Sequence, residues 1–285
     1  MIPNRFEYFC PDTLDEALGL LAEYQDDAKL LAGGQSLLSF MKLRLANPAC
    51  LVDLRKIAGL SFIREDPTHS SIVIGAMTTH ARIRESRLLQ EQCPLLPRTT
   101  AVVGDVQVRN RGTLGGSLAH ADPAGDLPAA ILALDAEMKA VGPRGERWIA
   151  AADFFLGMYT TALEPDEILT EIRVPVLRDR RAAYLKSARR PSDFAIVGIA
   201  ISVKDRSDGV CDRIAIGVTG LTDKPYRART VEARLSGHPL TDDSIGAAAQ
   251  DIAEGLEAAG NIHASPAFRL HLARVYLSRA IRAAN

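Results

Sequence analysis

Stretches in which apolar residues recur at helical intervals alternate with short apolar runs along the chain. Residues 13–16 have the spacing of a capping box, and apolar residues then recur every three or four positions as far as Leu21. Short apolar runs predict buried strands at 29–32, 51–54 and 71–75. A helix is predicted from Thr78 or Thr79 through Ile83, and another after Pro128.

The second half of the chain continues the alternation. Strands are predicted at 168–174, 182–186, 195–203 and 213–218, and helices at 243–256 and 266–284. A Pro and a charge run at 174–181 suit an exposed connection, and a weaker break lies near Gly59. The pattern predicts an α+β protein with a first domain at 1–177, divided into lobes of about 1–56 and 57–177, and a second domain at 178–285.

Composition excludes several classes of protein. The 285 residues are 47% hydrophobic, with 34 Lys and Arg against 35 Asp and Glu, which is ordinary for a globular protein. A net charge of −1 gives no electrostatic reason to bind nucleic acid or an anionic membrane. No apolar run reaches the roughly 20 residues that span a bilayer, and Pro and acidic residues in the first 20 positions do not fit a signal peptide.

The cysteines and histidines form no metal-binding pattern. Cys10, Cys50, Cys93 and Cys211 are far apart, and the chain has neither a C-x-x-C nor an H-E-x-x-H motif. Scattered cysteines fit a reducing, cytoplasmic location and argue against a disulfide framework, an iron–sulfur cluster or a structural zinc in this chain.

Two glycine-rich segments carry the candidate chemistry. They are Ala32-Gly-Gly-Gln-Ser36 and Arg111-Gly-Thr-Leu-Gly-Gly-Ser117. Glycine lets the backbone approach a ligand, and successive free N–H groups form an anion-binding concavity. Either segment alone is more often a simple tight turn, and neither has the Rossmann or Walker spacing. Two such turns about 80 residues apart favour a phosphate-bearing cofactor and leave its identity open.

A polar loop with two carboxylates, Asp122 and Asp126, follows the second glycine segment. Asp126 could cap the helix that begins near Pro128, or it could accept hydrogen bonds from ligand hydroxyls. The residue chemistry leaves these two interpretations about even.

The segments 32–45 and 107–126 resemble the two flavin-binding segments in the medium subunits of molybdenum hydroxylases, the carbon monoxide dehydrogenase, xanthine dehydrogenase and quinoline oxidoreductase type. The resemblance covers essentially the whole chain. It implies a two-lobed vanillyl-alcohol-oxidase-like (PCMH-type) FAD-binding domain, followed by a smaller α+β C-terminal domain with a β-sheet and helices.

The resemblance also implies the site residues. Residues 29–37 would wrap the FAD pyrophosphate, the other side would be closed by the second turn, and Asp126 would contact the ribityl or adenosine part. Lys186 would lie beside the flavin, with Arg190 one step further on, and Phe194 would face the isoalloxazine. The full set is Lys29, Ala32, Gly33, Gly34, Gln35, Ser36, Leu37, Thr113, Gly116, Ser117, Asp126, Leu169, Lys186, Arg190 and Phe194. As alternatives, the two cations would form a solvated edge, and Leu169 and Phe194 would belong to the core.

In this family, a large subunit carries the molybdenum cofactor and selects the substrate, and a small subunit carries two [2Fe–2S] clusters. The resemblance therefore implies an electron-transfer subunit in a dimer of heterotrimers. The apolar residues around Phe154, Phe155, Met158 and Tyr159 are one candidate interface, with a position in the core or under a loop as the default interpretation. The alternatives are a self-contained FAD-dependent oxidoreductase of the same fold and a non-redox scaffold that has lost its cofactor. Intact glycine turns argue against the scaffold.

Overall fold

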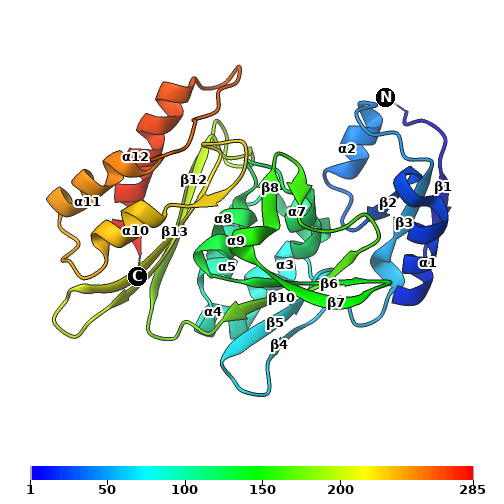
Figure 1. Ribbon diagram of the computed structural model, residues 1–285, viewed down its shortest axis with the longest axis horizontal. Helices are drawn as coiled ribbons and strands as arrows, with labels where there is room; N and C mark the ends of the chain where they lie inside the picture. The colour runs from blue at the N-terminus through cyan, green and yellow to red at the C-terminus, as the bar shows by residue number, and fades with distance from the viewer. Residues whose placement is uncertain (1, 285) are drawn as a thin grey trace.

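The computed structural model describes residues 2–284, in which three β-sheet units follow one another from right to left in Figure 1. The first unit is a parallel sheet of order β1-β3-β2. Its elements are β1 (Glu7–Phe9), α1 (Leu14–Tyr24), η1 (Gln25–Asp27), β2 (Ala28–Leu31), α2 (Leu37–Lys42), β3 (Cys50–Asp53) and η2 (Leu54–Lys56). The predicted strands at 29–32 and 51–54 are confirmed within one residue.

The first helix forms where the capping pattern predicts it. The Thr13 side chain accepts a hydrogen bond from the Glu16 N–H at 3.2 Å, and the Glu16 carboxylate accepts from the Asp12 N–H at 3.0 Å. Both N–H groups belong to the helix start, where no intrahelical acceptor exists. Ala17 and Leu21 are buried, and α1 packs against β2 and β3.

The second unit is an antiparallel sheet of order β4-β5-β10-β6-β7, covered by helices. Its strands are β4 (Ile63–Glu65), β5 (Ser71–Gly75), β6 (Glu137–Gly142), β7 (Gly145–Ala150) and β10 (Ile168–Pro175), with a separate hairpin of β8 (Phe155–Gly157) and β9 (Thr160–Thr161). Its helices are α3 (His80–Glu85), α4 (Arg87–Gln92), α5 (Leu95–Thr100), α6 (Val106–Arg111), α7 (Leu114–His120), α8 (Asp126–Ala133) and α9 (Ala151–Phe154). The β6–β7 hairpin is absent from the sequence prediction.

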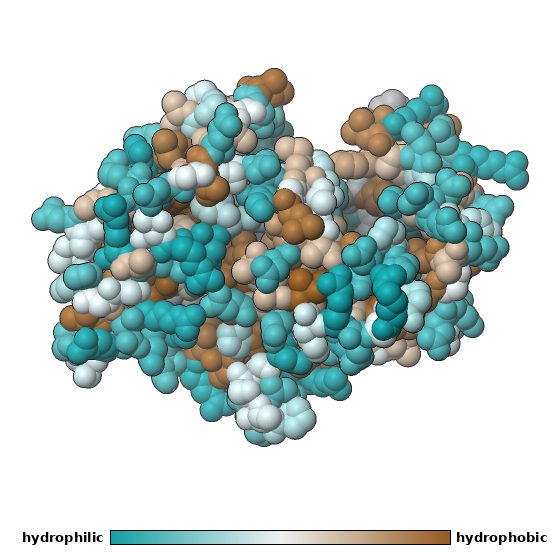
Figure 2. All heavy atoms as spheres, in the orientation of Figure 1, coloured by the Kyte–Doolittle hydropathy of each residue, from teal (hydrophilic) through white to brown (hydrophobic). Residues whose placement is uncertain are grey.

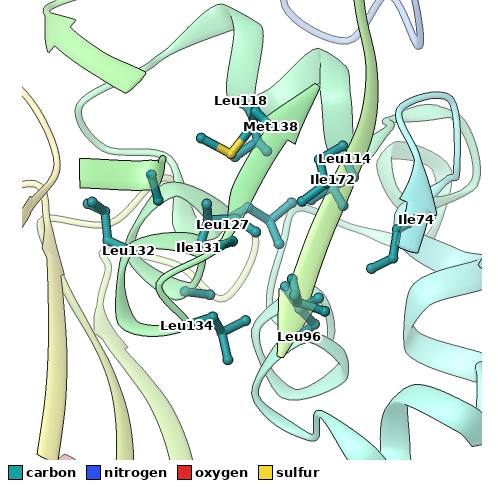
Figure 3. Close-up of a cluster of buried hydrophobic side chains, with 14 of the residues drawn as sticks. Ile74, Leu96, Leu114, Leu118, Leu127, Ile131, Leu132, Leu134, Met138 and Ile172 are labelled. Atoms are coloured by element: carbon teal, nitrogen blue, oxygen red, sulfur yellow. The ribbon is translucent and has the colours of Figure 1, made fainter. Parts of the chain in front are cut away.

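The largest core lies between this sheet and its helices. Figure 3 shows side chains of α7 and α8, including Leu118 and Ile131, pointing towards Ile172 on β10 and Met138 on β6. All four are fully buried. Because α7 is packed here along its length, its first residues, which belong to the second glycine segment, are held on a rigid support.

The third unit is an antiparallel sheet of order β11-β12-β13-β14 with helices on both faces (Figure 1). Its elements are β11 (Arg181–Ser187), β12 (Val197–Asp205), β13 (Cys211–Thr219), β14 (Tyr226–Arg227), α10 (Arg229–Leu235), α11 (Asp242–Ala248), η3 (Ala249–Asp251) and α12 (Pro266–Ala283). α10 and α12 cover one face, while α8 and α5 of the second unit cover the other. A side chain at Gly217 would collide with the Ala129 carbonyl, so β13 and α8 are in backbone contact.

The α+β architecture predicted from the sequence is confirmed. The predicted helix at 243–256 is wrong in extent, because α11 ends at Ala248 and a 3₁₀ turn follows. Within residues 2–284, no helix combines the length and the apolar character that crossing a membrane requires. In the same range, no three His, Cys, Asp or Glu side chains are placed to share a metal ion. The domain division at residue 177 stays a prediction.

Candidate functional site

A cavity of about 540 Å³ opens where the first lobe, the second lobe and the C-terminal sheet meet. Its wall contains every sequence-predicted site residue except Lys186 and Arg190. The predicted residues that line it are Lys29, Ala32, Gly33, Gly34, Gln35, Ser36, Leu37, Thr113, Gly116, Ser117, Asp126, Leu169 and Phe194. The structure therefore brings together two glycine segments that are far apart in the sequence.

The two glycine turns lie directly against each other. A Cβ atom at Gly33 would collide with the Arg111 carbonyl oxygen, and one at Gly116 would lie 3.2 Å from the Ala32 Cβ. Gly34 has φ +75°, a conformation that favours glycine. Glycine is thus required at Gly33 to let the backbone of the first lobe touch that of the second.

The first turn presents a row of unused hydrogen-bond donors. In the part of the chain that the structure describes, the backbone N–H groups of residues 33–37 donate to no protein acceptor. The turn is held by its carbonyl groups instead: Gly34 accepts from the Leu38 N–H at 3.2 Å, and Ser36 accepts from the Phe40 N–H at 3.0 Å. Consecutive N–H groups left free beside a cavity are the feature that binds phosphate oxygens.

The second turn differs, because the N–H groups of residues 114–117 are already bonded within the protein. The Leu114 N–H donates to the Thr78 carbonyl at 3.0 Å, and the Gly115 N–H donates to the Ala76 carbonyl at 2.8 Å. The Gly116 N–H donates to the Thr113 hydroxyl at 3.1 Å, as in an N-cap. This turn therefore supports the first turn through close backbone packing. Towards the cavity it presents the hydroxyl-bearing side chains of Thr113 and Ser117.

Asp126 lies at the junction between the cavity and the C-terminal sheet. Its N–H begins α8, but its carboxylate does not cap the helix; the Tyr184 hydroxyl donates to it at 2.5 Å and the Lys186 ammonium at 3.0 Å. Burial raises the pKa of Asp126 despite the attraction of Lys186. Burial and the Asp126 charge raise the pKa of Tyr184 well above its ordinary value. Both side chains of the Lys186–Asp126 pair are only 6% exposed.

Lys186 lies outside the cavity wall, whereas Asp193 and Phe194 in the loop after β11 belong to it. Lys186 lies behind Asp126 and also donates to the Asp193 carbonyl at 2.9 Å, so this loop is tied to the buried pair. Phe194 is 63% exposed at the rim of the cavity, which is not the core position considered as an alternative. Leu169 is buried in β10 and still lines the cavity. Arg190 is exposed and lies outside the wall.

The cavity wall also contains residues that no sequence pattern indicated, namely Met77, His80, Val103, Gly104 and Val108. His80 is the most informative of these, because its Nδ1 is buried without a hydrogen-bond partner among the described residues. Burial, with a smaller contribution from Arg109, lowers the pKa of His80 to about 4. The Thr79 cap predicts the helix that carries His80, but only the fold shows that this helix reaches the cavity.

Comparisons with known proteins agree with this geometry. Residues 4–177 match the FAD binding domain in molybdopterin dehydrogenase, and residues 182–284 match the CO dehydrogenase flavoprotein C-terminal domain. The carbon monoxide dehydrogenase medium chain of Hydrogenophaga pseudoflava is 39% identical, over 100% of this chain and 98% of the relative. The 6-hydroxypseudooxynicotine dehydrogenase complex subunit alpha of Paenarthrobacter nicotinovorans is 37% identical, over 99% and 95%.

A solved structure of the carbon monoxide dehydrogenase from Hydrogenophaga pseudoflava, described as lacking the Mo-pyranopterin moiety of the molybdenum cofactor, superposes with a TM-score of 0.96. It shares 41% sequence identity, with 100% of this chain and 98% of that chain covered. Fold and site therefore define an FAD-binding oxidoreductase subunit. The chain belongs to the family of medium, FAD-binding subunits of molybdenum hydroxylases, as the resemblance of its two glycine segments predicted.

The free N–H groups of residues 33–37 fit the pyrophosphate of FAD, and the bare Cα atoms of Gly33 and Gly34 leave the backbone accessible.

We expect Gly33→Ala to lower FAD affinity about tenfold or more, because its Cβ would force the two turns apart. The flavin-to-protein absorbance ratio of the purified chain measures this. The control is Gly19→Ala in α1, where a Cβ meets nothing within 4 Å; FAD content at the wild-type level in both variants would contradict the close contact.

Removing Lys186 leaves the Asp126 carboxylate buried with only Tyr184. We expect Lys186→Met to lower the free energy of unfolding by about 3 kcal/mol, against less than about 1 kcal/mol for Lys204→Met, whose pair with Asp212 is exposed. Without the cation, the pKa of Asp126 rises further, so the folded variant binds a proton that the unfolded chain releases. The loss is therefore larger at pH 8 than at pH 6. Urea unfolding at both pH values checks this, and a loss independent of pH would contradict it.

The lowered pKa of His80 predicts a loss of stability in acid. Between pH 6.5 and about 4, the unfolded chain binds a proton on this residue that the folded chain does not, so stability falls as the pH decreases. From pH 7.5 to pH 5, the free energy of unfolding should fall by about 2 kcal/mol more in the wild type than in His80→Gln. The measurement is urea unfolding with saturating FAD, and parallel pH profiles would show that His80 is not responsible.

Proposed function

We propose that this chain passes electrons from the iron–sulfur clusters of a partner subunit, through FAD, to an external acceptor. The observation that carries the proposal is the phosphate-binding turn at the junction of the three sheet units, in a chain that aligns over its full length with a carbon monoxide dehydrogenase medium chain. The exposed Phe194 at the cavity rim supports it, because an electron carrier needs one side of its cofactor near the surface.

The proposed partners are a large subunit with the molybdenum cofactor and a small subunit with two [2Fe–2S] clusters, assembled as a dimer of heterotrimers in the cytoplasm. The relatives support a separate substrate-binding subunit. One is named for carbon monoxide and another for 6-hydroxypseudooxynicotine, although both are similar to this chain over nearly its whole length. Such different substrates are explained if a partner selects them.

In the proposed mechanism, bound FAD supplies the redox chemistry, and the protein supplies binding, orientation and electrostatics. The N–H groups of residues 33–37 would hold the pyrophosphate, and the second turn fixes the backbone that carries them. Lys29, Gln35, Thr113 and Ser117 add polar groups around the phosphates, while Ala32, Leu37, Gly116 and Leu169 fill the wall.

The buried pair acts on the flavin end of the cavity. Lys186 is proposed to act on FAD mainly through Asp126, which it orients, and through the Asp193 carbonyl that it holds. Phe194, the next residue, is proposed to lie against the isoalloxazine ring, and Arg190 to contribute positive charge from outside the wall. These groups position the cofactor and exclude water on one side.

The test is purification of the tagged chain from cells that express it with its genomic neighbours. We expect co-purification of a molybdenum polypeptide and an iron–sulfur polypeptide, with two [2Fe–2S] clusters for each FAD. The Gly33→Ala complex should keep its iron and molybdenum and lose FAD together with electron delivery to the acceptor. A chain that purifies alone and turns over a substrate by itself would contradict the proposal and favour the self-contained oxidoreductase.

A further inference from the structure

Three aromatic rings from three separate segments meet beside the cavity. They belong to Phe40 in α2, His120 at the end of α7, and Tyr159 in the turn between β8 and β9. The centroids of Phe40 and His120 are 5.3 Å apart, those of Phe40 and Tyr159 5.7 Å, and those of His120 and Tyr159 5.0 Å. The first two pairs are edge-to-face, the arrangement that aromatic rings favour.

These rings connect the two helices that begin at the glycine turns. α2 starts just after the first turn and carries Phe40 in its second half, while α7 starts within the second turn and ends at His120. The two turns are therefore joined twice, once by the contact of Gly33 with the Arg111 carbonyl and once by the rings at the far ends of their helices. Ser36 and Ser117, which line the cavity, lie between these contacts along their two segments of the chain.

The backbone holds Tyr159 in this position. Its φ is +54°, in the left-handed region that side chains other than glycine rarely adopt, and its N–H donates to the Ala121 carbonyl at 3.1 Å. Its neighbours Leu156 and Met158 are exposed, as are Leu43 and Leu45 after α2. Figure 2 shows hydrophobic surface over α2, at the upper right of the molecule.

The cluster joins the two lobes, and two of its three rings lie outside the cavity wall. His120 lines the cavity, while Phe40 and Tyr159 lie behind it and outside the wall. Burial lowers the pKa of His120, which favours the neutral ring. α2 packs onto its own lobe through Met41, in a small cluster with Leu31 and Leu51. The rings are thus a substantial part of what ties this short helix to the second lobe.

We propose that Phe40, His120 and Tyr159 form a latch between the two lobes that keeps the cavity closed around FAD and sets the rate at which FAD leaves. Release of FAD requires α2 and its glycine turn to move away from α7, and this movement separates the rings. The proposal depends on FAD binding alone and does not depend on any partner subunit, so it can fail or succeed independently of the proposed electron-transfer role.

The test measures FAD release from the full-length chain, with an apo-flavoprotein of high affinity as the trap. Tyr159→Ala removes two of the three ring contacts and should release FAD about tenfold faster. Tyr159→Phe keeps the ring and should release FAD at the wild-type rate. Phe268→Ala removes an exposed ring on α12, outside the cavity wall, and serves as the matched control.

A double-mutant cycle separates a latch from a general loss of packing. Because Phe40→Ala and Tyr159→Ala remove one contact in common, the double variant should release FAD more slowly than the product of the two single effects predicts. Tyr159→Leu replaces Tyr159→Ala if the latter does not fold, with at least a threefold faster release expected. A rate for Tyr159→Ala or Tyr159→Leu equal to that of the wild type, or strictly multiplicative effects in the cycle, would overturn the latch.

Discussion

The contact between the two glycine turns is the constraint on which the rest of the site depends. Gly33 touches the Arg111 carbonyl, and this is possible only without a side chain. The second turn is in turn fixed to the strand-to-helix connection by the hydrogen bonds of Leu114 and Gly115 to Thr78 and Ala76. The two turns therefore have different roles. The N–H groups of residues 114–117 in the second turn are bonded to the protein, whereas those of residues 33–37 in the first turn are free for the cofactor.

The C-terminal unit completes the cavity by holding the loop that leads to Asp126. The Thr219 hydroxyl shares its one proton between the carbonyls of Pro123 and Gly125, at 2.6 and 2.8 Å, and the Gly220 N–H donates to the Pro123 carbonyl at 2.7 Å. The Lys186–Asp126 pair lies at the end of the same loop. The third sheet thus supports one wall of a site whose two glycine turns both lie in the first two units.

The sequence predicted the features that depend on local residue chemistry. The Thr13 cap, the strands at 71–75 and 168–174 and the two glycine segments were all predictable from spacing. The β6–β7 hairpin was missed, and the C-terminal helix at 243–256 was drawn too long, because tertiary packing sets these limits. No local signal showed that Tyr184 would share Asp126 with Lys186, or that His80 would reach the cavity, since each contact joins segments that only the fold brings together. The difference in hydrogen bonding between the two turns is also visible only in the fold, because the acceptors of the second turn include the carbonyls of Thr78 and Ala76 in another segment.

Amide hydrogen exchange, measured residue by residue with and without FAD, tests the central claim most directly. If the first turn grips the pyrophosphate and the second braces it, FAD should strongly slow exchange at Gly33 to Leu37. Exchange at Leu114 to Ser117 should change little, because those N–H groups are bonded within the protein already. Protection that appears mainly at Leu114 to Ser117, with Gly33 to Leu37 unchanged, would contradict the account.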